Sequence, residues 1–138
     1  SLAVELLLKL ADLCQDDDAR RRASYVVETL APSMARYPAA FGHLLGSADL
    51  LINGATELAI VGDPKSPDFR TLARVAGEHY VPGIIIAGGA PRDDADVALL
   101  KGRDARGGRA TAYLCRNYAC EEPARSAEQL REQLERLP

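Results

Sequence analysis

The chain has 138 residues, of which 47% are hydrophobic and 27% charged, and its formal net charge is −3. These values are typical of a globular protein with one ordinary domain or two small packed units. No apolar run approaches the roughly 20 residues that cross a bilayer, so we expect no membrane partner. Affinity for nucleic acid requires clustered Lys and Arg. Because the basic residues here are interspersed with acidic ones, we expect no nucleic-acid partner either.

The cysteine count and the start of the chain predict where the protein is located in the cell and whether it is a fragment. Three cysteines cannot all pair within one chain, and a chain of this length and hydrophobicity does not need a disulfide framework. No secretory signal with a basic region and a cleavage motif precedes the first helical pattern. We therefore expect a cytoplasmic protein. Since the helical pattern begins at Leu2 and no initiating Met is present, we also expect the chain to be a fragment of a larger protein.

The segment 1–53 is predicted to be all-helical. Apolar residues recur at spacings of three and four in three stretches, which begin near Leu2, Asp18 and Pro38. We expect Asp18 to cap the second helix and Pro32 to kink or break it. The first helix is expected to bury one stripe of residues: Ala3, Leu6, Leu7, Leu10, Leu13 and Cys14.

Two residues of this helical segment could suggest chemistry. Cys14 falls on the apolar stripe and is best explained as a small buried hydrophobic residue. His43 has no Cys, Asp or Glu near it at ligand spacing, so we expect a structural role and not metal binding.

From residue 54 the pattern changes to strands alternating with helices. Short apolar runs over 57–62, 83–87 and 110–115 predict three strands. Ser66 and Ser126 are suitable N-caps for two helices, the first between two strands and the second at the C-terminus. A strand, a helix and a second strand form a right-handed crossover with parallel strands. We therefore predict that 54–138 is an α/β domain with a small, mostly parallel three-stranded sheet flanked by helices, and with one or two helical turns near 95–100.

Ligands of open α/β sheets bind beyond the carboxyl ends of the strands, which here are 62–63, 88–89 and 115–120. No glycine-rich phosphate-binding motif and no nucleophile-elbow motif occurs there. Asp63 precedes a proline and is best explained as a turn residue. No pair of carboxylates is placed for acid–base work. The sequence therefore predicts no cofactor and no catalytic residue.

Cys115 and Cys120 are the candidate site residues. If 115–120 were extended, their Cα atoms would lie on the order of 16 Å apart, whereas a disulfide needs less than about 7 Å. A bridge therefore requires a turn over 116–118, and Asn117 tolerates the left-handed backbone of such a turn. Three interpretations stay open: packing or structural pairing, redox chemistry with Arg116 as the neighbouring charge, and metal binding, for which two cysteines supply half of a structural zinc site.

Several stretches resemble the C-terminal end of one protein family. They are Leu99-Leu100-Lys-Gly102-Arg, Thr111-Ala-Tyr-Leu-Cys-Arg-Asn-Tyr-Ala-Cys120-Glu-Glu-Pro123, Ile60-Val-Gly-Asp-Pro64 and Tyr80-Val-Pro82. The family is that of the thioredoxin-domain-containing proteins related to the spermatogenesis-associated protein. The resemblance implies a parent with an N-terminal thioredoxin-like domain, which has its own cysteine motif, and an α/α toroid similar to sugar epimerases and glycosidases. Residues 1–53 would then be the last helices of the toroid and 54–138 the C-terminal α/β unit.

Three hypotheses about function follow. The leading one is a non-catalytic structural and interaction domain, whose partners are the thioredoxin-like domain and the toroid of the parent. In the second, Cys115 and Cys120 form a redox-active dithiol that exchanges with the thioredoxin-like domain. In the third, residues 1–53 form part of the wall of a carbohydrate-binding toroid. We also expect the chain to self-associate, since helices cut from a toroid leave apolar surface exposed.

Overall fold

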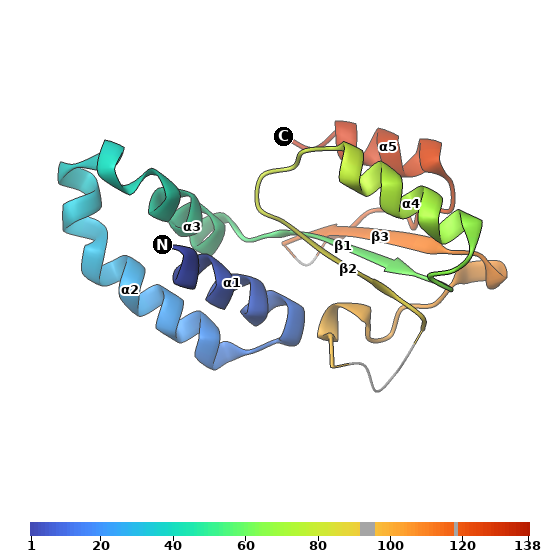
Figure 1. Cartoon of the computed structure of the whole chain (residues 1–138), viewed down its shortest axis with the longest axis horizontal. Helices are drawn as coiled ribbons and strands as arrows, with labels where there is room; N and C mark the ends of the chain where they lie inside the picture. Colours follow the sequence, from blue (N-terminus) through green and yellow to red (C-terminus); the bar gives the residue numbers. More distant parts are fainter. Residues whose placement is uncertain (92–95, 118) are drawn as a thin grey trace. The chain divides into compact units, whose positions relative to one another are not determined.

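The computed structural model describes residues 1–91, 96–117 and 119–138. The chain divides into two compact units, Ser1–Ala55 (unit 1) and Thr56–Pro138 (unit 2), which are described separately. Unit 1 is helical, and unit 2 combines a mixed sheet with helices (Figure 1). The protein is therefore of the α/β class.

Unit 1 consists of α1 (Leu2–Cys14), α2 (Asp17–Arg36), the 3-10 helix η1 (Pro38–Phe41) and α3 (Gly42–Asn53). α1 packs against both α2 and α3. The cap of α2 is Asp16, two residues before the expected Asp18, and its carboxylate accepts hydrogen bonds from the amides of Asp18 and Ala19, each at 3.0 Å. Two otherwise unpaired donors of the first helical turn are thereby satisfied.

The buried face of α1 differs from the predicted stripe. The side chains that α1 buries are Val4, Leu8 and Ala11. Leu6 and Leu10, which were expected inside, are 59% and 39% exposed. Cys14 is also exposed, because α1 ends there and the next residue adopts a left-handed conformation. Apolar residues occur almost all around this helix, so their spacing alone could not select the buried face.

A kink or a break was predicted near Pro32, and the break is wrong, because α2 continues through this proline to Arg36. A proline inside a helix removes one backbone donor and its ring crowds the preceding turn. Pro32 itself is exposed, while Met34 beyond it is buried. The packing of Met34 favours continuation of the helix past the proline.

Unit 2 contains four strands and two α-helices in the part that the structure describes. Its elements in chain order are β1 (Thr56–Val61), α4 (Pro67–Glu78), β2 (Ile84–Gly89), η2 (Ala98–Leu100), η3 (Arg106–Gly108), β3 (Thr111–Arg116), β4 (Ala119–Cys120) and α5 (Ala127–Glu135). The expected caps are in place, since the Ser66 hydroxyl accepts from the Phe69 amide and the Ser126 hydroxyl from the Gln129 amide. The helical turn expected near 95–100 is η2, and residue 95 lies outside the described residues.

The core of unit 2 lies between one face of the sheet and the helices α4 and α5, which pack against each other (Figure 1). Alternate residues of β1 and β3 point into this core, as the two-residue period of a strand requires. The largest fully buried side chains of this cluster are Leu58, Ile60, Leu72, Leu114 and Leu130.

The prediction of a mostly parallel three-stranded sheet is wrong. The strand order is β2-β1-β3-β4, and only the β1–β2 pair is parallel within the described sheet. β3 runs antiparallel to β1, with Thr111 beside Val61. A parallel third strand would have required a crossover back to the other end of the sheet, usually through a helix. The connection after β2 contains 3-10 turns in its described part, and β3 begins at the end of the sheet where β1 and β2 finish.

The outer side of β3 is covered by the segment that follows it. Arg116 pairs with Ala119 and Cys115 with Cys120, which forms the short fourth strand. The Glu121 amide then donates to the Leu114 carbonyl at 2.8 Å. Further along, Ala112 and Ala124 exchange two backbone hydrogen bonds. The residues after the turn therefore extend the sheet along most of β3.

Candidate functional site: a cross-strand disulfide in unit 2

Cys115 and Cys120 are joined by a disulfide. They lie opposite each other on the antiparallel strands β3 and β4. Their Cα atoms are 3.9 Å apart, because the chain reverses at Asn117, whose φ of 51° is left-handed. Asn adopts this conformation more readily than most residues. The turn that a bridge requires is thus present at Asn117, while Tyr118 lies outside the described residues.

The two halves of the disulfide differ in their surroundings. Cys115 is 3% exposed and lies near the end of β3. Cys120 is exposed at the end of the two-residue strand β4. The bond thus connects a buried strand to the surface, and solvent reaches it from the Cys120 side.

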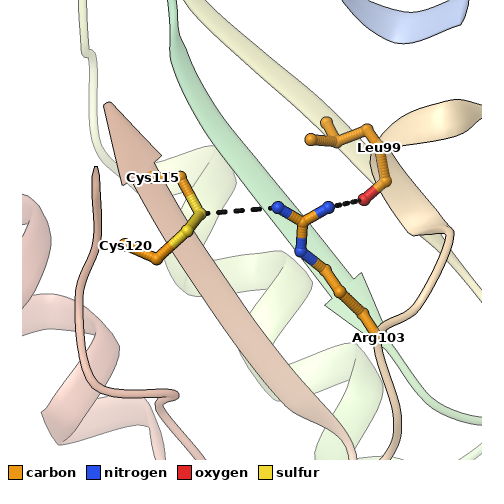
Figure 2. Close-up of a disulfide and its surroundings, with 4 residues drawn as sticks. All are labelled: Leu99, Arg103, Cys115 and Cys120. Carbon is orange, nitrogen blue, oxygen red and sulfur yellow. Dashed lines mark hydrogen bonds between the residues drawn. A yellow bond between two sulfur atoms is a disulfide. The ribbon is translucent and has the colours of Figure 1, made fainter. Parts of the chain in front are cut away.

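A positive charge lies beside the buried sulfur. The Arg103 guanidinium donates a hydrogen bond to the Cys115 sulfur at 3.5 Å, as Figure 2 shows. The same guanidinium donates to the backbone carbonyl of Leu99. It also lies 5.8 Å from the centre of the Tyr113 ring, within the range of a cation–π contact. Three separate groups therefore fix the position of the Arg103 side chain.

The loop that carries Arg103 is itself anchored to β3. The Tyr113 hydroxyl donates to the carbonyl of Asp104 at 2.7 Å. The Thr111 hydroxyl, which is fully buried, accepts from the Arg106 amide at 3.0 Å and donates to the Arg109 carbonyl at 3.1 Å. These bonds hold the loop before β3 against the strand, and with it the arginine against the sulfur.

Arg103 is a candidate site residue that the sequence did not reveal. The neighbouring charge expected from the sequence was Arg116, which is next to Cys115 in the chain. Arg103 is 12 residues away from Cys115, so only the fold brings them together. Arg103 ends the Leu99–Arg103 stretch, and Cys115 belongs to the Thr111–Cys120 stretch. Two of the stretches that carry the family resemblance therefore meet at this contact.

The other predicted positions do not converge on the disulfide. Because β3 is antiparallel, its carboxyl end lies opposite the ends of β1 and β2, where the Gly62 amide donates to the Gly89 carbonyl at 2.9 Å. Asp63 accepts from the Lys65 amide at 2.9 Å, as a turn residue does. In unit 1, His43 lies 2.9 Å from the Glu5 carboxylate on the surface.

Unit 2 also contains a cavity. Its volume is about 290 Å³, and it is lined by Arg109, Arg125, Ser126 and Gln129, so neither cysteine belongs to its lining. The described residues contain no group of three or more His, Cys, Asp or Glu side chains that could hold a metal ion. Nor do they include a helix with both the length and the apolar character needed to cross a membrane. The disulfide with Arg103 is therefore the best candidate for a chemical site.

No protein-family model, no curated protein and no solved structure matches the chain.

Proposed function

We propose that unit 2 is a thiol–disulfide exchange module in which Cys115 and Cys120 alternate between a disulfide and a dithiol. The single observation that carries this proposal is the asymmetric disulfide, with one exposed half and one buried half beside a cation. Reactive cysteines occur in partly exposed, electropositive surroundings, whereas buried structural cysteines are inert. The pair at 115 and 120 combines both features.

The partner in this proposal is a dithiol protein of the thioredoxin class. Its two thiols would be oxidised to a disulfide while the Cys115–Cys120 bond is reduced, so that two electrons and two protons move to this chain. The resemblance to thioredoxin-domain-containing proteins supports this choice, because it implies a thioredoxin-like domain with its own cysteine motif in the same parent. A cytoplasmic location would also support it, since disulfides of cytosolic proteins are usually transient and catalytic or redox-sensing.

The test is a redox titration of the chain with Cys14→Ser, which removes the free and exposed third thiol. The protein is equilibrated in glutathione buffers of stepped potential, and the fraction of disulfide is measured by mass spectrometry after thiol alkylation. We expect a two-electron transition between roughly −120 and −270 mV, the range of known exchange proteins, with an unchanged circular dichroism spectrum. A disulfide that stays closed until well below about −300 mV, or that opens only with loss of structure, would contradict the proposal.

The second candidate is a non-catalytic structural and interaction domain, in which the disulfide fastens β4 to β3. The observation that favours it is the length of β4, because a strand of two residues has few backbone hydrogen bonds of its own. Structural disulfides resist reduction by glutathione. The same titration therefore separates the candidates, and a potential below about −300 mV with a fall in stability on reduction supports the structural one.

We further propose that unit 1 comes from the end of an α/α toroid in the family named above. Its helical composition supports this origin, since α1, α2 and α3 pack on one another. In the intact parent these helices would form part of the wall of a carbohydrate site. Saccharide titration by calorimetry of the parent and of this chain tests the proposal, with binding expected only for the parent. Binding of equal strength to both would contradict it.

A further inference from the structure

We propose that the disulfide opens in one direction only: an incoming thiolate attacks the sulfur of Cys120, and Cys115 leaves as a thiolate stabilised by Arg103. This inference rests on the exchange function proposed above and assigns a role to each of its three residues. Arg103 is then a catalytic residue, because its guanidinium touches the leaving sulfur.

Access selects the sulfur that is attacked. A thiolate must approach along the S–S axis, from the side opposite to the sulfur that leaves. Cys120 is exposed on the edge strand β4, so a second protein can reach it. Cys115 is 3% exposed, and Figure 2 shows that the Arg103 side chain lies beside its sulfur. Attack on Cys115 would require the incoming group to displace this arginine.

Charge selects the sulfur that leaves. A disulfide exchanges faster when the leaving thiol is a more stable thiolate, and a neighbouring cation stabilises a thiolate. Arg103 is permanently charged, and its guanidinium contacts the backbone carbonyl of Leu99 and the ring of Tyr113, neither of which is an anion. One acidic residue, Glu57 on β1, is the cross-strand neighbour of Cys115 and lies on the same face of the sheet. The contacts to Leu99 and Tyr113 hold the guanidinium beside the sulfur, and we expect its charge to outweigh that of Glu57 because the guanidinium touches the sulfur directly.

The exchange balances in two steps. In the first, a partner thiolate forms an S–S bond to Cys120, the Cys115–Cys120 bond breaks, and the electron pair of that bond goes to the Cys115 sulfur. In the second, the other partner thiol, as a thiolate, attacks its neighbour in the mixed disulfide and releases the Cys120 thiolate. The partner leaves oxidised, and the two thiolates of this chain take up the two protons that the partner released.

The position of the mixed disulfide can be read directly, because trypsin cleaves after Arg109, Arg116 and Arg125 and so separates the two cysteines. The oxidised Cys14→Ser chain is treated briefly with excess glutathione, quenched with acid and N-ethylmaleimide, and digested. We expect glutathione on the peptide 117–125 and the maleimide on the peptide 110–116. Glutathione on 110–116, or equal amounts on both peptides, would overturn the inference.

The role of Arg103 is tested with Arg103→Gln and Arg103→Lys, both in the Cys14→Ser chain. Arg103→Gln should slow the opening by glutathione roughly threefold or more, and Arg103→Lys, which keeps the charge, should restore most of the rate. The matched control is Arg106→Gln, which removes a charge from the same loop. We expect glutathione to open the disulfide of this control at the same rate as that of the Cys14→Ser chain.

A second readout is independent of exchange. In the Cys14→Ser, Cys120→Ser background, the pH profile of Cys115 alkylation by iodoacetamide should move to higher pH with Arg103→Gln and stay in place with Arg106→Gln. An Arg103→Gln protein that retains its circular dichroism, its opening rate and this pH profile would overturn the role of Arg103. Failure of the glutathione titration would instead overturn the exchange function itself, and this inference with it.

Discussion

The Asp68 carboxylate in the first turn of α4 accepts a hydrogen bond of 2.7 Å from the backbone amide of Ala110, which is 42 residues later in the chain. Ala110 directly precedes β3, and its side chain is part of the core beneath α4 and α5. This bond therefore connects the start of a helix to the entry of the strand that carries Cys115. Acidic residues are also favoured in the first helical turn by the helix dipole.

This contact predicts a pH-dependent effect of Asp68→Asn. The Ser66 side chain, followed by the Ala110 amide, lowers the pKa of Asp68 to about 2, from an ordinary value of 3.8. A carboxylate with a lowered pKa contributes stability above its unfolded pKa and loses it as the pH falls through the folded one. Asp68→Asn should therefore lower the urea midpoint at pH 6. The difference in midpoint between this variant and the unsubstituted chain should shrink towards pH 2.

The matched control for this substitution is Asp104→Asn, which changes an exposed acid of the same unit. Its urea midpoint at pH 6 should equal that of the unsubstituted chain. An Asp68→Asn protein with a constant loss of stability from pH 6 to pH 2 would contradict the assignment, because the effect would then not come from the charged carboxylate.

Gly62 should not accept a side chain. A Cβ at this position would lie 2.9 Å from both the Cα and the Cβ of Ala110, and backbone atoms in a packed core cannot move away at low cost. We expect Gly62→Ala to destabilise the protein by about 1–3 kcal/mol. Gly77→Ala is the matched control, because nothing lies within 4 Å of its Cβ position near the end of α4. The control should gain up to about 1 kcal/mol, as measured by thermal and urea unfolding.

The loop before β3 should depend on the hydroxyl of Thr111. Thr111→Val keeps the shape of the side chain and removes both hydrogen bonds, to the Arg106 amide and the Arg109 carbonyl. Leaving these partly buried groups unpaired costs at most about 1–3 kcal/mol, the range for fully buried groups. Thr111→Ser retains the hydroxyl and should retain the protection of the Arg106 amide in hydrogen exchange. Equal protection of that amide in both variants would argue against the anchoring role of Thr111.

We expect the chain to self-associate through α1. Leu2, Leu6 and Leu10 follow one another at a spacing of four and are 74%, 59% and 39% exposed, so they form a continuous apolar row on the helix. Leu2→Glu combined with Leu6→Glu should reduce the weight-average mass in sedimentation equilibrium. Tyr25→Ser, which removes an exposed aromatic residue from α2, should leave the mass unchanged. An unsubstituted chain that is monomeric at high micromolar concentration would contradict this expectation.

The sequence allowed prediction of those elements that have strong local signals. The serine caps at Ser66 and Ser126 and the apolar runs of β1, β2 and β3 identify these elements, because capping and strand patterns depend on neighbours in the chain. The direction of β3 carries no such signal. It depends on whether the connection after β2 crosses the sheet, and a Gly-rich stretch does not specify its path.

Two other features depend on tertiary contacts in the same way. α1 is apolar around most of its circumference, so α2 and α3, rather than the spacing, determine that Val4 and Leu8 are buried. The pair of cysteines was identified from the sequence, and the need for a turn at Asn117 followed from the length of an extended chain. Arg103 could not be assigned in this way, since the strand direction and the loop path together place it beside Cys115.

The segment after Asn117 also affects how the protein meets other molecules. An unpaired strand at the side of a sheet can recruit a strand from a second chain, which is a common start of aggregation. Here the chain's own residues already occupy that side of β3, and the bond between Cys115 and Cys120 attaches them covalently. A strand from another chain would have to displace this segment, which the disulfide holds against β3. We therefore expect oxidation at this pair to hinder the pairing of β3 with a strand of another chain.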